Sequence, residues 1–529
     1  VFNLARENNL KMTVVSKWYS GQTILVTGAT GFMGKVLLEK LLRTCPDIQH
    51  IYIIVRPKRG LAPSIRVEEM VKLPLFETLM KNNPDVLKKI IAIEGDITKP
   101  DLGLSKEQKK QLISEVTIVF HMAASLRLEA GMKAAIINNT LSTKFVLDFC
   151  LEMKELKVFI HLSTAFCHCD HDVMEEKVYP PPHNPHDIIH AMEWMDDETI
   201  EMITPRLLGP HPNCYTYSKR LAEYLVYEYK DKLPVCITRP SIVIIYYSDF
   251  LCTSWVDTLN GPIGLLVGGG KGVIRSMMCS PNSVAQVIPA DAAVNSLITI
   301  AWICGNNKSE NIPVYNVTSG DVKRVTWHEV LDLGRKSVYK TPFEYTIWYP
   351  DGDIRTNWLI HYICVILFHY LPAYLIDFLL FLARQKRFMV RVQNRISIGL
   401  EVLQYFTMRD WNFNNKNLLS IKTILSEEDR ETFFIDNIDY DIERYIADSI
   451  LGARTYCVKE PLSSLPRCRR NIFILYCLHL LTKFLFYGFL VWLVVQNLDS
   501  ARFFLDYSAN LLQKIPIVGC FIPVTISNS

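Results

Sequence analysis

The stretch Thr23–Gly34, TILVTGATGFMG, constrains the fold of this chain more than any other. Its apolar residues 24–26 are typical of a strand buried on both faces, and the residues that follow the stretch have helical periodicity. Gly28, Gly31 and Gly34 recur between the two at three-residue spacing. Glycines placed in this way permit a tight turn and let a pyrophosphate approach the helix N-terminus, whose dipole favours negative charge. The stretch therefore predicts a dinucleotide site, with cofactor contacts from Thr27, Gly28, Thr30, Gly31, Phe32 and Gly34.

Apolar strand-like runs alternate with helical stretches as far as about residue 300. Such alternation is typical of a parallel sheet covered by helices on both faces. We therefore predict an α/β fold, a Rossmann-type doubly wound parallel sheet, followed by a mostly helical, hydrophobic C-terminal region. The later strands are expected at 51–55, 90–98, 116–125 and 157–166, and helices are expected in part of 60–89 and at 138–153 and 213–229.

Basic residues at the end of the second expected strand bear on the choice of cofactor. An NAD enzyme usually carries an acidic residue at this place, where it binds the ribose 2′-hydroxyl. Arg56 holds the place here, with Lys58 and Arg59 nearby. Because a guanidinium suits a 2′-phosphate, the sequence favours NADPH. Further cofactor contacts are expected after the third and fourth strands, from Asp96 and Ile97 beside the adenine and from the small residue Ala123.

A tyrosine and a lysine four residues apart form the expected catalytic pair. Tyr215 and Lys219 lie in a predicted long helix, so both project from one of its faces. We expect the lysine ammonium to lower the pKa of the phenol, making it a better proton donor near neutral pH, and to hold the nicotinamide ribose. Ser163 or Thr164, at the end of the fifth strand, would bind the substrate oxygen. His121, inside an apolar strand, is expected to be structural.

About fifty residues separate the hydroxyl pair from the tyrosine, and this insert is rich in His, Asp and Pro. Its Cys167, His168, Asp170 and His171 could be metal ligands, but their spacing does not pair them as ligands usually are. We expect no metal and interpret the insert as a polar lid over the substrate.

A second glycine-rich stretch, at 264–277, carries Lys271 and Arg275. It is not a P-loop, because Gly272 stands where a Ser or Thr would follow the lysine. It is either a flexible loop or a basic edge for an anionic group such as a CoA phosphate.

The composition excludes several functional classes. A net charge of +3, without a basic stripe interleaved with aromatic residues, argues against nucleic acid as a partner. Fourteen cysteines without a CxxC pair indicate free thiols in a reducing compartment. The first twenty residues lack the apolar core of a secretory signal, and Met12 is a plausible alternative start. We therefore expect the catalytic part to face the cytosol.

Two long apolar segments in the C-terminal part indicate contact with a membrane. Residues 358–383 are interrupted by Pro372 and Asp377, so they suit a re-entrant or interfacial hairpin, or the wall of an acyl tunnel, better than a straight span. The basic stretch 387–396 that follows suits lipid headgroups. Residues 472–495 are long enough to cross a bilayer, and the positive-inside rule places the arginines before them on the cytosolic side. A buried core helix is the alternative.

The glycine fingerprint at 27–34, Asp96, Asn139, the hydroxyl pair and Tyr215 with Lys219 follow one another in an order that resembles the extended short-chain dehydrogenase/reductase family. From about residue 20 to 500 the chain resembles the alcohol-forming fatty acyl-CoA reductases, those of insects most. The segments that carry this resemblance are HLSTAF, YTYSKRLAE, NGPIGLLVGGGKGVIRSM, LFHYLPAYLIDF and FTMRDWNFNNKNL. It implies that Asn139 belongs to the cofactor site and that Thr164 contacts the substrate. Phe166 departs from the family, which commonly has STAY instead of STAF.

The resemblance implies reduction of a long-chain fatty acyl-CoA by NADPH to a primary alcohol, through a fatty aldehyde and with release of CoA. A hydroxysteroid dehydrogenase type of reductase, a reductase that stops at the aldehyde, and a non-catalytic scaffold are the alternatives. Expected partners are the acyl-CoA and an intracellular membrane, first that of the endoplasmic reticulum, with the peroxisome or lipid droplet as alternatives. The sequence specifies neither chain-length preference nor oligomeric state.

These signals divide the chain into four expected parts. An N-terminal tail (1–20) precedes an NADPH-binding extended reductase domain (21–340). A C-terminal acyl-reductase region (341–465) contains the interfacial segment 358–383. A membrane anchor and tail (466–529) follow, with a shorter apolar stretch at 515–526.

Overall fold

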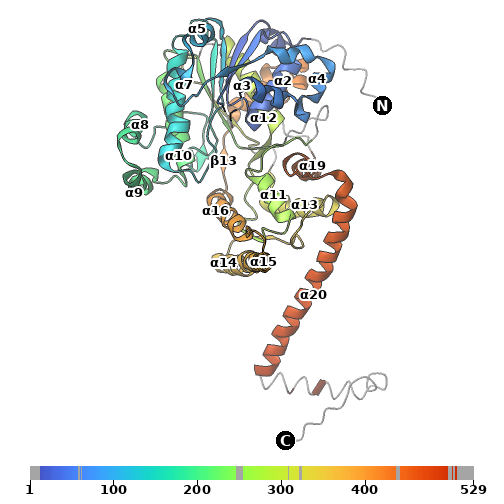
Figure 1. Cartoon of the computed structure of the whole chain (residues 1–529). Coiled ribbons are helices and arrows are strands. Elements are labelled where there is room, and N and C mark those ends of the chain that lie inside the picture. The colour runs from blue at the N-terminus through green and yellow to red at the C-terminus, as the bar shows by residue number, and fades with distance from the viewer. Residues whose placement is uncertain are drawn as a thin grey trace.

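Seven parallel strands form the central sheet of the computed structural model (Figure 1). The structure describes residues 12–57, 60, 62–245, 254–307, 309–320, 324–435, 441–497, 503 and 507–508. Across the sheet the strands are β11 (Val314–Val317), β7 (Val235–Pro240), β5 (Val158–Leu162), β4 (Ile118–His121), β1 (Thr23–Thr27), β2 (His50–Val55) and β3 (Ile90–Glu94). The predicted doubly wound parallel sheet is confirmed. Lys58, Arg59 and the apolar stretch 515–526 lie outside the described residues.

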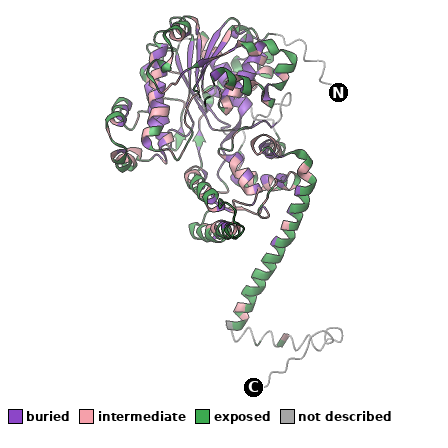
Figure 2. Ribbon diagram, in the orientation of Figure 1, coloured by how far each residue is buried: buried purple, intermediate pink, exposed green. Residues whose placement is uncertain are grey.

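Helices cover both faces of the sheet because successive strand residues point to opposite sides. Ile24 and Val26 of β1 join the core beneath α2 (Phe32–Thr44), α12 (Ala290–Asn306) and α17 (Lys416–Ile424). Leu25 joins the other core, beneath α5 (Lys106–Glu115), α7 (Ser142–Cys150) and α10 (Cys214–Glu228). Figure 2 shows the sheet and the inner faces of these helices as buried. Because α17 returns to the first core, the C-terminal region shares that core with the sheet.

The insert after β5 is fixed to α10 and β7 by a buried ion pair. Glu223 of α10 accepts hydrogen bonds from Arg239 of β7, Nε to Oε1 at 2.9 Å and Nη2 to Oε2 at 2.7 Å. Arg239 also donates to the carbonyl oxygens of Glu175 and Lys177 in the insert. On the same helix, Arg220 pairs with Asp170 at 2.7 Å. The insert is therefore held against the outer side of α10, and its helices α8 (Pro185–Trp194) and α9 (Asp197–Leu208) lie beside it (Figure 1).

Cys167, His168 and Glu223 come together in this network, with one potential ligand atom of each within 4.8 Å of the others. The Arg239 guanidinium lies 2.7 Å from the Glu223 Oε2 and 3.0 Å from the His168 Nε2, so a positive charge already occupies the cluster. Burial raises the pKa of Glu223, but Arg239 and His168 outweigh it and hold this pKa well below its ordinary value. Burial and Glu223 raise the pKa of Cys167, so the thiol stays protonated and donates to the carboxylate. The network is structural.

The apolar segment 358–383 forms one continuous helix. It runs through α14 (Trp358–Val365), a π-helical turn (Ile366–Tyr370) and α15 (Leu371–Leu382). Pro372 has no N–H to donate to the carbonyl oxygen four residues earlier, and a π-helical turn just before it accommodates this missing hydrogen bond. Asp377 accepts the backbone N–H groups of Phe388, Met389 and Val390 at 2.9–3.0 Å, so it caps α16 (Met389–Thr407). The prediction of a hairpin within this segment is therefore wrong. Asp377 caps the next helix, α16, and does not interrupt the helix in which it lies.

Helix α20 (Leu465–Asn497) extends away from the rest of the structure, and Figure 2 shows it exposed along most of its length. Two helices, Trp358–Leu382 and Leu462–Gln496, are long and apolar enough to cross a membrane. Only 6% of the apolar window of the second is buried, which rules out the alternative of a core helix.

Replacing Glu223 by glutamine should lower the free energy of unfolding by about 3–5 kcal/mol, because the Arg239 charge is left buried without its partner. Urea denaturation of the detergent-purified protein measures this. The matched control is Glu77→Gln, which removes an exposed pair with Lys81 and should change stability by less than about 0.5 kcal/mol. An equal, small effect of both changes would contradict the assigned role of the buried pair.

Candidate active site

The strand register brings the expected site residues to one edge of the sheet. Thr27 pairs with His121, and His121 pairs with His161, so the carboxyl ends of β1, β4 and β5 are level. His121 bonds the Thr27 hydroxyl at 2.9 Å and the Thr143 hydroxyl at 3.0 Å. Burial lowers the pKa of His121 to about 3, so the ring is neutral. His121 thus ties two strands' ends to α7, and its expected structural role is confirmed.

The glycine turn leaves no room for side chains on its inner side. Gly28 has a φ of +76°, and a Cβ there would lie 2.7 Å from the backbone nitrogen of Ala123. A Cβ at Gly34 would lie 2.5 Å from the Gly28 carbonyl oxygen. Gly31 is the N-cap of α2 and offers no capping side chain, so the first N–H groups of the helix are available to an anion. These residues fit the pyrophosphate of a dinucleotide.

The remaining expected cofactor residues lie along the same edge. Arg56 is exposed directly after β2, and Val55 of β2 pairs with Glu94 of β3. Asp96 therefore lies just after the end of the neighbouring strand β3, where its carboxylate accepts the Thr98 backbone N–H at 3.1 Å. Three other residues are only partly buried here: Thr30, Phe32 and Ile97.

Asn139 lies in the π-helical turn Ile136–Leu141 and connects two parts of the site. Its side-chain oxygen accepts the Ser125 backbone N–H at 2.8 Å, and its amide donates to the Ser218 hydroxyl of α10 at 3.0 Å. Only 1% of Asn139 is exposed. It fixes the loop after β4 to the helix that carries Tyr215.

Thr164 and Tyr215 line one cavity of about 170 Å³. Ser163 does not line it, since its hydroxyl points to the Cys167 sulfur at 3.7 Å. The rest of the wall is mainly apolar and comes from α11 (Pro262–Gly270), α16 and neighbouring segments, including Ile242, Leu265, Trp327, Leu403, Phe406 and Trp411. The cavity thus places two hydroxyl groups next to an apolar surface.

The protonation of Tyr215 differs from the sequence-based expectation. Desolvation raises the pKa of its phenol above the ordinary value, Cys167 adds to the rise, and the Thr164 hydroxyl partly offsets it. Lys219 donates to the Leu162 carbonyl oxygen at 2.6 Å, and desolvation lowers the pKa of this lysine to about 8. The expected lowering of the phenol's pKa by Lys219 is wrong, because desolvation dominates at Tyr215 and the ammonium is directed at β5.

Phe166 belongs to an aromatic cluster that sequence reasoning did not find. Its ring meets those of Phe406, Trp411 and Phe413 edge-to-face, with centroids 5.3–5.4 Å apart. Of the described residues that line the cavity, Phe166 alone comes from the insert. The expected polar lid is therefore wrong, because helices α11 and α16 cover the site instead. The aromatic residues at 406–413 can be seen in the sequence, but no local sequence pattern predicts that they contact Phe166.

Lys271 and Arg275 do not form a basic edge. Lys271 pairs with Glu460 at 2.6 Å, and Arg275 pairs with Asp351 at 2.7 Å. Both side chains are largely buried, and the preceding residues form helix α11 rather than a loop. Both alternatives for this stretch, the phosphate edge and the flexible loop, are therefore wrong.

The parallel sheet, the glycine turn and the Thr164–Tyr215–Lys219 grouping define a nicotinamide-dependent oxidoreductase of the short-chain dehydrogenase/reductase type. Residues 26–297 match an NAD-binding family model described as Male sterility protein, and residues 368–460 match a second model with the same description. The chain is 39% identical over 461 residues to Fatty acyl-CoA reductase 1 of Xenopus laevis, an alignment that covers 87% of this chain and 89% of that protein. It is 37% identical to Fatty acyl-CoA reductase 2 of Mus musculus, over 93% of this chain and 94% of that protein. The chain belongs to the fatty acyl-CoA reductase family.

Solved structures confirm the fold. The terminal R domain of the myxalamid PKS-NRPS pathway superimposes with a TM-score of 0.54 at 19% identity, covering 82% of this chain and 91% of that domain. The reductase domain of a nonribosomal peptide synthetase from Mycobacterium tuberculosis gives a TM-score of 0.54 at 16% identity, with the same coverage.

The low pKa of Lys219 predicts an alkaline limb in the pH profile. If the ammonium is needed, kcat/KM of the reductase should fall as pH rises through about 8, the pKa of this lysine in the free enzyme. Lys219→Arg should lower the rate but remove this limb, because a guanidinium stays charged. Initial rates from pH 6 to 10 measure both. A wild-type profile that is flat to pH 10 would contradict the assignment.

Proposed function

We propose that this protein reduces long-chain fatty acyl-CoA to a primary fatty alcohol with NADPH, through a fatty aldehyde and with release of CoA. The observation that carries the proposal is the cavity in which Thr164 and Tyr215 meet an apolar wall. Two hydroxyl groups suit a carbonyl oxygen that becomes negative, and the wall suits a hydrocarbon chain. The reductase names of the relatives agree with this chemistry.

Tyr215 is the proposed proton donor: the phenol is protonated at neutral pH, and negative charge on the neighbouring substrate oxygen draws its proton. We assign Thr164 and Tyr215 to the thioester oxygen, where both donate hydrogen bonds that strengthen as negative charge develops. A nicotinamide held beside them would supply the hydride to the carbonyl carbon. Tyr215 then protonates the oxygen, which gives a hemithioacetal.

Collapse of the hemithioacetal breaks its carbon–sulfur bond, and CoA leaves as the thiol. The aldehyde that forms presents its oxygen to the same two hydroxyl groups. A second NADPH, bound after the first NADP⁺ has left, would supply the hydride that reduces the aldehyde to the alcohol, with Tyr215, reprotonated from solvent, again donating the proton. One cavity serves both steps because each needs the same oxyanion site and the same proton donor. Lys219 lies one helical turn after Tyr215 and would hold the nicotinamide ribose.

NADPH is the proposed form of the cofactor. Arg56 is exposed at the end of β2, beside the turn that follows β3, where the adenosine ribose of a dinucleotide is bound in this type of fold. Its guanidinium can pair with a 2′-phosphate through two hydrogen bonds. We assign the pyrophosphate to the turn at 28–34.

We propose that α20 crosses an intracellular membrane and that the helix 358–382 lies along its surface. Both helices expose large apolar side chains over most of their length. Arg467, Arg469 and Arg470 precede the apolar part of α20, which places the catalytic part in the cytosol by the positive-inside rule. None of the described residues in 358–382 lines the cavity, which argues against a tunnel wall there. The endoplasmic reticulum is the first compartment to examine.

Tyr215→Phe should lower fatty alcohol production from palmitoyl-CoA and NADPH by at least about a hundredfold, because the proton donor is lost. Membranes that contain the protein are incubated with both compounds, and the lipid products are resolved by mass. Tyr224→Phe, on the same helix, is the control and should retain wild-type activity. Wild-type protein that yields aldehyde alone would support the single-step alternative, and no thioester consumption would overturn the proposal.

Arg56→Ala should reduce the preference for NADPH over NADH by at least about tenfold, since charge-assisted hydrogen bonds to the 2′-phosphate are lost. The kcat/KM ratio of the two cofactors with one acyl-CoA measures this. Lys81→Ala, which removes an exposed charge that pairs with Glu77 on α4 (Glu77–Asn82), is the control. An unchanged ratio in Arg56→Ala would overturn the assignment of this residue.

A further inference from the structure

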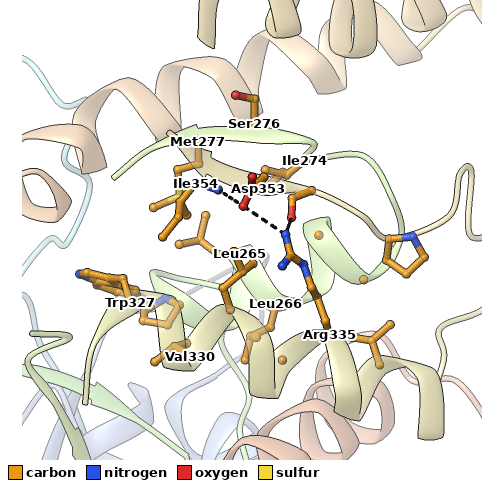
Figure 3. A pocket seen from close by; sticks show the side chains of 18 residues that line it. Leu265, Leu266, Ile274, Ser276, Met277, Trp327, Val330, Arg335, Asp353 and Ile354 are labelled. Carbon is orange, nitrogen blue, oxygen red and sulfur yellow. Dashed lines mark hydrogen bonds and ion pairs between the residues drawn. The ribbon is translucent and has the colours of Figure 1, made fainter. Parts of the chain in front are cut away.

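A second cavity, of about 110 Å³, lies further along helix α11 and is here named the far chamber. It is lined by α11, α13 (Trp327–Lys340) and the short strands β9 (Ser276–Met278) and β12 (Asp353–Arg355) (Figure 3). Its walls are mostly aliphatic and include Leu266, Ile274, Met277, Val330, Val338 and Ile354. The chemistry of this lining selects a hydrocarbon ligand.

The far chamber and the cavity at Thr164 and Tyr215 share a wall. Pro262, Leu265 and Trp327 line both of them. Figure 3 shows Leu265 and Trp327 reaching toward the chamber from α11 and from the start of α13. The two spaces are therefore neighbours, and an acyl chain that extends from Thr164 into the far chamber must pass between these side chains.

Three consecutive glycines in α11 differ in the room that the structure leaves for a side chain. A Cβ at Gly268 would lie 2.6 Å from Ile274, and one at Gly270 would lie 2.7 Å from Phe343, so close packing accounts for both. A Cβ at Gly269 would meet no atom within 4 Å, although this residue lines the far chamber. Packing does not require glycine there. A side chain at 269 would occupy the chamber itself.

The far end of the chamber is polar. Arg335 of α13 donates to the Gly352 carbonyl oxygen at 2.6 Å and pairs with Asp353 at 3.2 Å (Figure 3). A hydrocarbon chain gains nothing by extending into a charged pair, because it would displace hydrogen bonds that it cannot replace. The Arg335–Asp353 pair thus marks a limit to the apolar space.

We propose that the far chamber binds the methyl end of the acyl chain and that its free volume, bounded by Gly269 and the Arg335–Asp353 pair, sets the chain-length preference. This inference rests on the proposed function, which places the acyl carbonyl at Thr164 and Tyr215. Each methylene that moves from water into the chamber favours binding about fourfold. Chains long enough to reach the chamber are therefore preferred over chains that end before it.

Gly269→Leu tests the inference, because it fills the chamber without a backbone clash. An equimolar mixture of dodecanoyl-, palmitoyl- and stearoyl-CoA is given to the full-length protein in membranes, and the ratio of alcohols reports relative kcat/KM by internal competition. We expect the stearyl to dodecyl alcohol ratio to fall by at least about tenfold, the effect of two or more excluded methylenes. Gly334→Leu, on the opposite wall in α13, is an independent second variant with the same expected result.

Gly399→Leu is the matched control, since it adds the same side chain to a helix at an exposed position where a Cβ meets no atom within 4 Å. Its product ratio should equal that of the wild type. A wild-type ratio, or an equal loss at every chain length, in both chamber variants would overturn the inference while alcohol formation by the wild-type protein upholds the proposed function. Absence of alcohol from the wild-type protein would instead overturn both.

Discussion

The Glu223–Arg239 ion pair is the contact on which the site depends. It joins α10, which carries Tyr215 and Lys219, to β7, and through Arg239 it also fixes the insert after β5. Both charged side chains are almost wholly buried, so removing either partner leaves a charge without compensation. The position of the phenol relative to Thr164 therefore depends on a pair that takes no part in the chemistry.

The central sheet and its cofactor edge could be predicted because their signals are local. The strand, glycine turn and helix at 23–44 are contiguous in sequence, and the packing at Gly28 and Gly34 explains why only glycine fits there. Helical spacing placed Tyr215 and Lys219 on one face, and strand order placed Thr164 at the same edge of the sheet.

The rest of the site could not be predicted, because it is made by residues far apart in sequence. The cluster of Phe166 with Phe406 and Trp411 spans more than two hundred residues. The polar composition of the insert instead predicts that the insert covers the substrate site. Spacing alone also gave the wrong direction for the pKa of Tyr215, since desolvation is set by packing. A charged residue at 377 predicts an interruption of the apolar segment, whereas Asp377 caps the next helix.

The central claim is that one cavity carries out two successive reductions of the same carbon. The most direct test supplies NADPH deuterated at the transferred hydride position together with palmitoyl-CoA, and analyses the product by mass spectrometry and NMR. The account predicts hexadecanol with both hydrogens of the carbinol carbon replaced by deuterium, and little free aldehyde during turnover. Aldehyde with a single deuterium as the final product, or alcohol with only one deuterium, would contradict it.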